Sequence, residues 1–251
     1  DSGLDSPALK VLGNNVVIQE NDLQGHPGIS IQAQRVNIVR NVDLGGIWIW
    51  DGSNNVRIES NKINDLPKKQ SPNVEAPGII LGGMPESNSN KNVNYGVKVV
   101  EILGNQIFQM HNSGISTKSA IDGQTLGDIE DVTIAHNRIT DCALGGLNEK
   151  FDGQAVGGIV LRGVSGLRII DNYIAENGRD GVADCGIFVY GCQGLQIVGN
   201  TITENGSHRL QCVNFTAKDP AWENINGFKE NGFEFTVYGE DQENVNPSVV
   251  A

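Results

Sequence analysis

Several residue types and patterns are scarce in this chain, and each scarcity excludes a class of protein. The 251 residues include only 2 Met, 8 Pro and 4 Cys, and aromatic residues make up 6% of the total. No apolar run approaches the roughly 18 residues needed to cross a bilayer, so we expect no transmembrane segment. Glycine is abundant instead, with 32 residues, and asparagine and β-branched residues are frequent. Because these residues rank low in helix propensity, a helical bundle or coiled coil is excluded.

Positively charged residues, Lys and Arg, are also few. The chain has 18 Lys and Arg against 30 Asp and Glu, which gives a formal net charge of −12. Proteins that bind a phosphate backbone normally carry the opposite sign, so we expect no nucleic-acid partner. The charge does not exclude an acidic polysaccharide, but a site for one would have to concentrate the few Lys and Arg side chains locally.

Sequence signatures of metal and cofactor sites are missing as well. The cysteines fit no metal-ligand spacing and are too few to staple a fold of this size. We expect them to be buried small hydrophobes, and one disulfide is left open for a secreted protein. Neither a Gly-x-Ser-x-Gly elbow nor a phosphate-binding Gly-rich loop occurs, so we expect no organic cofactor. The cysteines are Cys142, Cys185, Cys192 and Cys212.

Two short units alternate along the chain, and this repetition predicts the fold. The first unit reads apolar-x-apolar-x-x-Asn-x-apolar, and the second reads Gly-Ile-x-apolar. The asparagines of the first unit are Asn21, Asn41, Asn61, Asn105, Asn137, Asn172 and Asn200. The second unit begins at Gly28, Gly46, Gly78, Gly114, Gly158 and Gly186.

The spacing of these units indicates a coil of short strands. The first two asparagine intervals are 20 residues each, which is about the length that three short strands and three turns require. Each strand alternates, so its apolar residues point inward. The asparagine lies between two strands, at a turn where one residue must take a left-handed conformation. Stacked copies of this amide can hydrogen-bond along the axis of the coil.

With these units, the chain resembles the right-handed parallel β-helix of the pectate-lyase-like superfamily over about residues 8–205. The resemblance implies an all-β solenoid of about seven to eight coils. A β-sandwich with regular turns is the alternative, and a leucine-rich repeat is disfavoured because its Leu framework is missing. The β-helix fold hosts lyases, hydrolases, epimerases, phage tailspikes and adhesins, so it does not fix a function.

We expect one domain, with residues 1–206 as the β-helix and residues 207–251 as a C-terminal cap. The repeat is lost after residue 206 and aromatic residues gather there, which favours a closing cap over a separate binding segment. Residues 1–7 are too few to cover the first coil. Because uncapped strands aggregate, we expect either a longer parent chain or a second copy of this chain at that end.

Long loops flank the Gly-Ile strands and predict a working face there. These loops are residues 64–77, 82–95, 119–130, 140–157 and 175–185, and we expect the first four to wall a groove around Lys118 and Arg162. In the superfamily that the chain resembles, the same sheet carries the substrate cleft. In Gly-Ile-x-apolar-x, the two x positions point outward onto this face. The outward positions hold Gln32, Trp48, Trp50, Lys118, Arg162 and Tyr190, among others.

Two of these outward residues, Lys118 and Arg162, occupy the same position in neighbouring coils. Coils lie about 4.8 Å apart, so the two cations should be side by side. This arrangement in an acidic chain favours a site for a uronate-containing polysaccharide, and a solvated face with ordinary charges is the alternative. Arg162 would grip the carboxylate and stabilise an enolate-like intermediate, and Lys118 would be the base. Tyr190 would be the acid for the leaving oxygen.

The same face offers residues that could bind the sugar rings. Aromatic side chains stack on the apolar faces of pyranose rings. His111 precedes the Lys118 strand and lies near the expected site. The candidate substrate-binding residues are Trp48, Trp50, Gln32 and His111.

Two segments, Ser116–Ser119 and Leu161–Gly163, are similar to the Lys-Ser and Leu-Arg segments of alginate and chondroitin lyases with this fold. The resemblance implies that Lys118 is the base, that Arg162 assists it, and that Ca²⁺ neutralises the substrate carboxylate. Where those families carry acidic calcium ligands, residues 110–113 read Met-His-Asn-Ser. Calcium is therefore a candidate cofactor to which the sequence assigns no ligands.

Carboxylates offer a different chemistry. Two of them about 5–10 Å apart could hydrolyse a glycosidic bond as acid and base. Most adjoin glycines, which favours a role in turns. These residues are Asp51, Asp122, Glu149, Asp152, Asp180 and Asp184.

Together these features predict a secreted, extracellular or cell-surface protein that acts on an acidic polysaccharide by β-elimination or epimerisation. The alternative is a non-catalytic shaft, such as a spike, adhesin or filament segment, that binds glycans or simply stacks.

Overall fold

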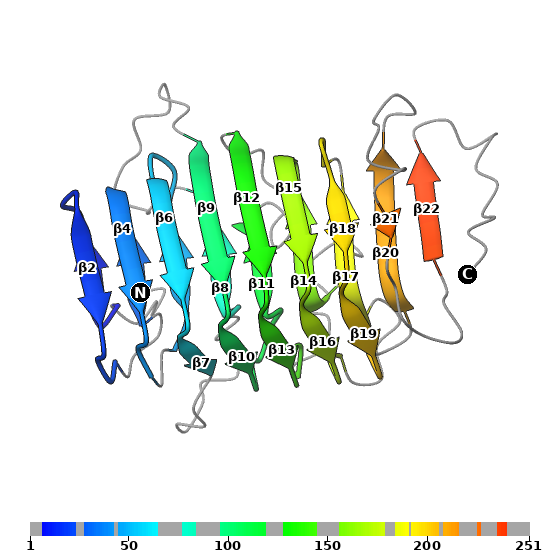
Figure 1. Cartoon of the computed structure of the whole chain (residues 1–251), viewed down its shortest axis with the longest axis horizontal. Coiled ribbons are helices and arrows are strands. Elements are labelled where there is room, and N and C mark those ends of the chain that lie inside the picture. The colour runs from blue at the N-terminus through cyan, green and yellow to red at the C-terminus, as the bar shows by residue number, and fades with distance from the viewer. Residues whose placement is uncertain are drawn as a thin grey trace, which may run out of the picture.

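The described residues form short parallel strands that stack side by side along one axis (Figure 1). The computed structural model describes residues 7–23, 28–42, 45–64, 77–83, 96–118, 128–144, 156–178, 184–190, 192–205, 208–215, 225–226 and 235–239. For residues 184, 185, 190, 208–215, 225–226 and 235–239 it gives the course of the strands only.

Among the described residues, three parallel sheets contain nine, eight and five strands, and the five coils from β5 to β19 each add one strand to all three. The first sheet is built from the Gly-Ile units: β1 (Leu9–Val11), β3 (Ile29–Ile31), β5 (Ile47–Ile49), β8 (Ile79–Leu81), β11 (Ile115–Thr117), β14 (Val156–Arg162), β17 (Asp184–Tyr190), β20 (His208–Phe215) and β22 (Phe235–Gly239). The prediction of an all-β solenoid of parallel strands is confirmed.

The other two sheets come from the asparagine units, one before and one after the asparagine. The second sheet contains β2 (Val16–Gln19), β4 (Gln34–Val39), β6 (Asn54–Glu59), β9 (Val97–Leu103), β12 (Ile129–Ala135), β15 (Val164–Ile170), β18 (Gln196–Val198) and β21 (Ile225–Asn226). The third contains β7 (Lys62–Asn64), β10 (Gln106–Phe108), β13 (Arg138–Thr140), β16 (Tyr173–Ala175) and β19 (Thr201–Thr203).

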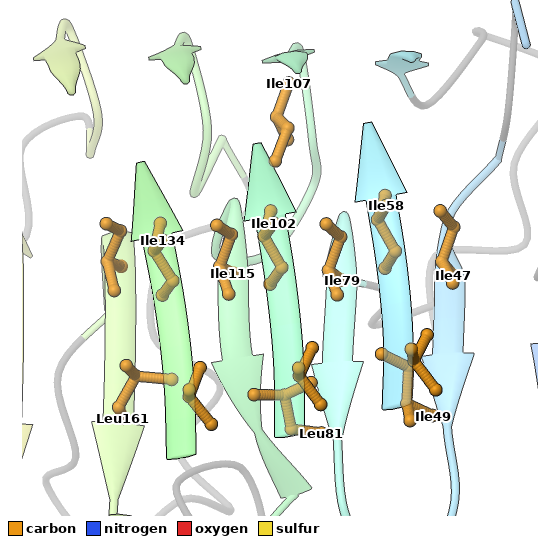
Figure 2. Close-up of a cluster of buried hydrophobic side chains, with 14 of the residues drawn as sticks. Ile47, Ile49, Ile58, Ile79, Leu81, Ile102, Ile107, Ile115, Ile134 and Leu161 are labelled. Carbon is orange, nitrogen blue, oxygen red and sulfur yellow. The ribbon is translucent and has the colours of Figure 1, made fainter. Parts of the chain in front are cut away.

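Inward residues of the three sheets meet in one continuous core of branched aliphatic side chains. Identical residues stack in register from coil to coil, as Ile47, Ile79 and Ile115 do in the first sheet (Figure 2). Ile102 and Ile134 stack in the same way in the second sheet (Figure 2). All five are fully buried, and burial of such a side chain contributes about 1.5–3 kcal/mol. The predicted inward parity of the apolar residues is confirmed.

The seven repeat asparagines form one ladder along the axis, as predicted. At every step from Asn21 to Asn200, the side-chain Oδ1 of one asparagine accepts from both the backbone N–H and the Nδ2 of the preceding asparagine in the ladder. Both bonds from Asn41 to Asn61 measure 2.9 Å. The residue before each asparagine carries the left-handed turn, as at Arg40 (φ 52) and His136 (φ 58). The amides therefore satisfy buried polar groups that the turn would otherwise leave unpaired.

A second, shorter ladder follows the third sheet and was not predicted. Asn177 Nδ2 donates to Asn205 Oδ1 at 2.8 Å, and the backbone N–H of Cys142 donates to Asn177 Oδ1 at 3.0 Å. The sequence did contain a signal, because Cys142, Asn177 and Asn205 each lie five residues after a ladder asparagine.

The sheets continue past the end of the sequence repeat. Strands β20, β21 and β22 extend the first and second sheets in parallel register, so residue 206 marks the end of the repeat rather than the end of the sheets. The predicted cap falls largely on residues 216–224, 227–234 and 240–251, which lie outside the described residues, and it stays a prediction. At the other end, β1 and β2 are the edge strands of their sheets.

Two cysteines can be described with their side chains. Cys142 and Cys192 are buried free thiols, as expected. The side chains of Cys185 and Cys212 lie outside the described residues. In the part of the chain that the structure describes, no helix has the length and apolar character that a membrane crossing requires.

Candidate functional site

The candidate residues line up at the carboxyl ends of the strands of the first sheet. Trp50 follows β5, Gly82 and Gly83 follow β8, and Lys118 follows β11. Arg162 ends β14 and pairs in register with Tyr190, which ends β17. The predicted order along the stack is therefore present in the backbone. The side chain of Tyr190 lies outside the described residues, as do most of the four loops predicted to wall this face.

The middle of each outward strand face is covered rather than open to solvent. The first outward position of the repeat is filled in register by Ser30, Ile80, Ser116 and Val160, and each is 5% exposed or less. Trp48, in the same column, is half-buried. Strand parity correctly gave the direction of these side chains but not their burial. On this face, partly exposed side chains such as Lys118 and Arg162 therefore lie at the strand ends.

Trp48 and Trp50 form an edge-to-face pair with ring centroids 5.0 Å apart and planes at 79°. Trp50 is only 8% exposed, and its indole Nε1 donates to Ser30 Oγ at 2.7 Å. Trp48 Nε1 is shielded from solvent and has no hydrogen-bond partner among the described residues. Trp50 thus has a packing role, and Trp48 is the ring of the pair with more exposed surface.

Asp51 and Gly83 join the ends of β5 and β8 by two hydrogen bonds. The backbone N–H of Asp51 donates to the carbonyl oxygen of Gly83 at 3.0 Å, and the N–H of Gly83 donates to Asp51 Oδ1 at 3.2 Å. Asp51 is 6% exposed, so this carboxylate is held inside the structure and is more than a turn former. Gln32, one coil earlier, donates from Nε2 to the Asp51 carbonyl oxygen at 3.4 Å.

The side chain of Lys118 lies against Gly83. A Cβ placed on Gly83 would come within 2.9 Å of Lys118 Cγ and 3.5 Å of Trp50 Cζ3. Gly83 also has a positive φ of 93°, which other residues rarely adopt. The stem of Lys118 therefore leans over the coil of β8, and it does so only because residue 83 has no side chain.

The strand that carries Lys118 ends one residue before it, at Thr117. Thr117 points into the core and is fully buried. Its hydroxyl accepts a hydrogen bond from the backbone N–H of Arg162 at 3.0 Å, which gives this buried polar group a partner. This contact joins the strand ends that hold Lys118 and Arg162. The close approach of their two charged groups stays a prediction.

His111 lies between β10 and β11 and is half-buried. It follows the fully buried Met110, and Asn112 Oδ1 accepts from the N–H of Ser113 at 2.6 Å. A role for His111 in substrate binding stays a prediction.

The described residues around Lys118 do not assemble a calcium site. A hard cation prefers several oxygen ligands that converge on one point. Among the described side chains, no three His, Cys, Asp or Glu residues come together as a metal site would require. The segment 110–113 supplies no carboxylate, and Asn112 Oδ1 is engaged by Ser113.

Other charged side chains gather on the outer face of the second sheet, away from the site. Arg57 bonds Glu59 at 2.8 Å and Glu101 at 2.7 Å. The hydrogen bond from Arg57 is the main reason that the pKa of Glu59 lies below its usual value, and the bond to Glu59 likewise raises the pKa of Arg57. These exposed ion pairs leave Arg57 occupied and mark this face as an ordinary solvated surface.

The sequence-based reasoning did not predict the contacts among Asp51, Gly83 and Lys118. One signal was available, since a Gly-Gly pair directly follows a strand whose neighbours end in Trp50 and Lys118. Such a pair marks a close approach of another chain segment to the backbone.

Comparison with known proteins supports the fold. A family model described as "Right handed beta helix region" matches residues 86–245, more than half of the chain. No curated protein matches the sequence.

Proposed function

Because this chain belongs to the right-handed β-helix family, we propose that it is a carbohydrate-active protein that acts on an acidic, uronate-containing polysaccharide. The reaction would be β-elimination or epimerisation. Both reactions begin by removal of the proton at C5 of a uronate, so one site can serve either. Secretion to an extracellular or cell-surface location is part of the same proposal, since such polymers are too large to be taken up intact.

The observation that carries this proposal is the position of Lys118 and Arg162 at equivalent strand ends of adjacent coils. The hydrogen bond from the N–H of Arg162 to the hydroxyl of Thr117 joins these two strand ends. Both side chains are half-buried at the end of the covered sheet face. In a chain of net charge −12, two cations at neighbouring coils would form a local site for a carboxylate.

In the proposed reaction, each of these residues has one task. Arg162 holds the uronate carboxylate through parallel N–H bonds and stabilises the charge that develops on it when the C5 proton leaves. Lys118 takes that proton. In elimination, the bond from C4 to the bridging oxygen then breaks, a C4–C5 double bond forms, and the oxygen takes a proton from Tyr190. In epimerisation, the C4–O bond stays intact, Lys118 keeps the proton that it took, and Tyr190 would donate a different proton to C5 from the opposite face.

Trp48 is the proposed stacking residue. It is the more exposed ring of the tryptophan pair. Trp50 packs against it edge to face and is itself held by its hydrogen bond to Ser30. Gln32 and His111 remain secondary candidates for contacts to sugar hydroxyls. No step is assigned to calcium, because no ligand set for it comes together among the described side chains.

One observation favours a second candidate function, that of a non-catalytic shaft. The outward positions Ile80 and Val160 are buried and apolar, and the asparagine ladder runs without interruption through seven coils. Both features stiffen the stack more than they serve chemistry. A spike or adhesin segment would need only these features.

The test is incubation with a panel of uronate polymers while two signals are followed, the ultraviolet absorbance of unsaturated product for elimination and the exchange of the C5 proton in deuterium oxide for epimerisation. We expect the wild-type protein to act on at least one polymer and Lys118→Ala to be inactive. Lys98→Ala is the matched control, because Lys98 is an exposed cation on the second sheet, paired with Glu130 at 2.9 Å. Equal activity in the wild type and Lys118→Ala would contradict the proposal and would favour catalysis by a pair of carboxylates. Absence of any reaction, together with glycan binding, would favour the shaft.

A further inference from the structure

Three described residues from neighbouring coils converge on Gly83. Asp51 bonds its backbone N–H through Oδ1, Trp50 approaches it from the coil of β5, and Lys118 lies over it from the coil of β11. We infer that Gly83, anchored by Asp51, is a positioning residue that seats the Lys118 side chain beside Trp50. This inference deepens the proposed function and rests on it for its catalytic consequence.

The contact at Gly83 involves the stem of the Lys118 side chain. The close approach at Gly83 involves Lys118 Cγ at 2.9 Å and Lys118 Cβ at 3.4 Å. These are the first two carbons of the side chain, so they cannot be displaced without rotating the whole side chain to another rotamer. Any side chain at residue 83 would therefore change the direction of the Lys118 ammonium group.

Gly83 is itself held in place. Two hydrogen bonds to Asp51 fix its backbone, and the N–H of Gly82 donates to the carbonyl oxygen of Ile49 at 2.8 Å. The Asp51 carboxylate is buried, so the bond that it accepts is shielded from competing water. The seat is thus built from one coil and its neighbours, and it forms before any ligand is present.

The position of the Lys118 side chain sets the direction in which the substrate would lie in the proposed reaction. Lys118 leans over the strand end of β8, on the side of the tryptophan pair, while Arg162 lies on the opposite neighbour of β11. A uronate held by Arg162 would therefore present C5 toward Gly82 and Gly83. The next sugar along the chain would extend toward Trp48.

A matched glycine provides the control for Gly83. Gly163 also has a positive φ, of 67°, but a Cβ there would meet nothing within 4 Å. Gly163→Ala therefore reports the backbone strain alone, whereas Gly83→Ala reports strain together with the collision with Lys118.

The first experiment measures thermal unfolding of Gly83→Ala, Lys118→Ala, the double variant and Gly163→Ala, and it needs no substrate. We expect Gly83→Ala to lower the melting temperature by about 3–10 °C. Lys118→Ala removes Cγ. In that background, Gly83→Ala should lower the melting temperature by no more than Gly163→Ala lowers it in the wild type. If Gly83→Ala lowers the melting temperature equally with and without the lysine side chain, the proposed contact between Gly83 and Lys118 is wrong.

The second experiment measures steady-state kinetics on whichever uronate polymer the wild type degrades. Gly83→Ala and Asp51→Ala should each lower kcat by about tenfold to a hundredfold with KM changed far less, because a misdirected base affects the chemical step. Gly163→Ala should match the wild type. A wild-type kcat in Gly83→Ala would overturn the positioning role. If the wild type neither degrades any uronate polymer nor exchanges its C5 proton, the proposed function fails together with this role, whereas the unfolding measurements still decide whether Gly83 holds the Lys118 side chain.

Discussion

Asn105 donates from its side-chain Nδ2 to Oδ1 of Asn137 at 3.0 Å, although 32 residues separate the two in sequence. Asn105 Nδ2 also bonds the carbonyl oxygen of Ile58, one coil earlier, at 2.9 Å. A single amide therefore connects three consecutive coils. The long loops between coils leave this connection unchanged, which is why the stack keeps its register through intervals of very different length.

The first prediction concerns this ladder. Asn105→Ala should lower the free energy of unfolding by on the order of 3 kcal/mol, because it leaves several buried groups unpaired. Asn21→Ala, at the exposed first coil, should cost about 1 kcal/mol. Urea unfolding measures both values. Equal losses at the two positions would show that burial does not set the strength of the ladder.

Much of this fold could be predicted from the sequence, because it depends on local alternation. The inward direction of Ile79 and Ile115 and the alignment of the asparagines follow from period two and from repeat spacing. The second ladder, through Asn177, was not predicted, because Cys142 occupies one of its positions and interrupts the asparagine repeat in the sequence. At Cys142 the donor to Asn177 is the backbone N–H, and the amino-acid sequence does not indicate such a backbone contact.

The second prediction separates the two tryptophans. Trp50→Phe removes the donor to Ser30 Oγ and leaves that buried hydroxyl unsatisfied, whereas Trp48→Phe removes an N–H that has no partner among the described residues. Both changes remove a similar volume. Trp50→Phe should therefore be less stable than Trp48→Phe by about 1–3 kcal/mol in urea unfolding. The reverse order would contradict the assignment of Trp50 as the supporting ring.

The third prediction concerns the buried thiol of Cys142. Burial raises its pKa from 9.0 to about 12, so the folded state keeps the proton at a pH where the unfolded chain has lost it. The stability that this thiol contributes is complete below pH 9 and is lost progressively as the pH rises toward 12.

Two measurements test this behaviour. Alkylation at mildly alkaline pH, followed by peptide mass mapping, should leave Cys142 unmodified in the folded protein and modify it in urea. The difference in unfolding free energy between the wild type and Cys142→Ala should narrow as the pH is raised above 9. Rapid modification of Cys142 in the folded protein would contradict its burial.

The fourth prediction concerns the charge cluster on the second sheet. Arg57→Ala removes the hydrogen bond that lowers the pKa of Glu59, so that pKa should rise toward its usual 4.5. The contribution of this pair to stability is present at neutral pH and is lost as the pH falls below about 4.5. Because the pair is exposed, the total effect on stability should be small.

A carboxyl-carbon NMR titration of Glu59 measures this change. Arg168→Ala is the control, since Arg168 lies on the same exposed face but bonds Thr133 Oγ1. A titration of Glu59 that is the same in Arg57→Ala and in the wild type would show that the ion pair does not persist in solution.

The site was harder to predict than the fold, for a physical reason. Parity placed Lys118 and Arg162 at equivalent positions, but β11 ends at Thr117, and beyond a strand end the alternation no longer sets side-chain direction. The direction of Lys118 depends on its contact with Gly83, and the junction to Arg162 depends on the Thr117 hydroxyl, 45 residues away. Such contacts between coils are set by tertiary packing, which local patterns do not encode.

Proton abstraction at C5 of a uronate is the step shared by elimination and epimerisation, and its detection tests the central claim most directly. The wild type and Lys118→Ala are incubated with each uronate polymer in deuterium oxide, and deuterium at C5 and unsaturated chain ends are measured together by NMR. The account predicts one of these two products with the wild type and neither with Lys118→Ala. A wild-type protein that yields neither product with any of the polymers, or a Lys118→Ala variant that yields the same product at the wild-type rate, would contradict it.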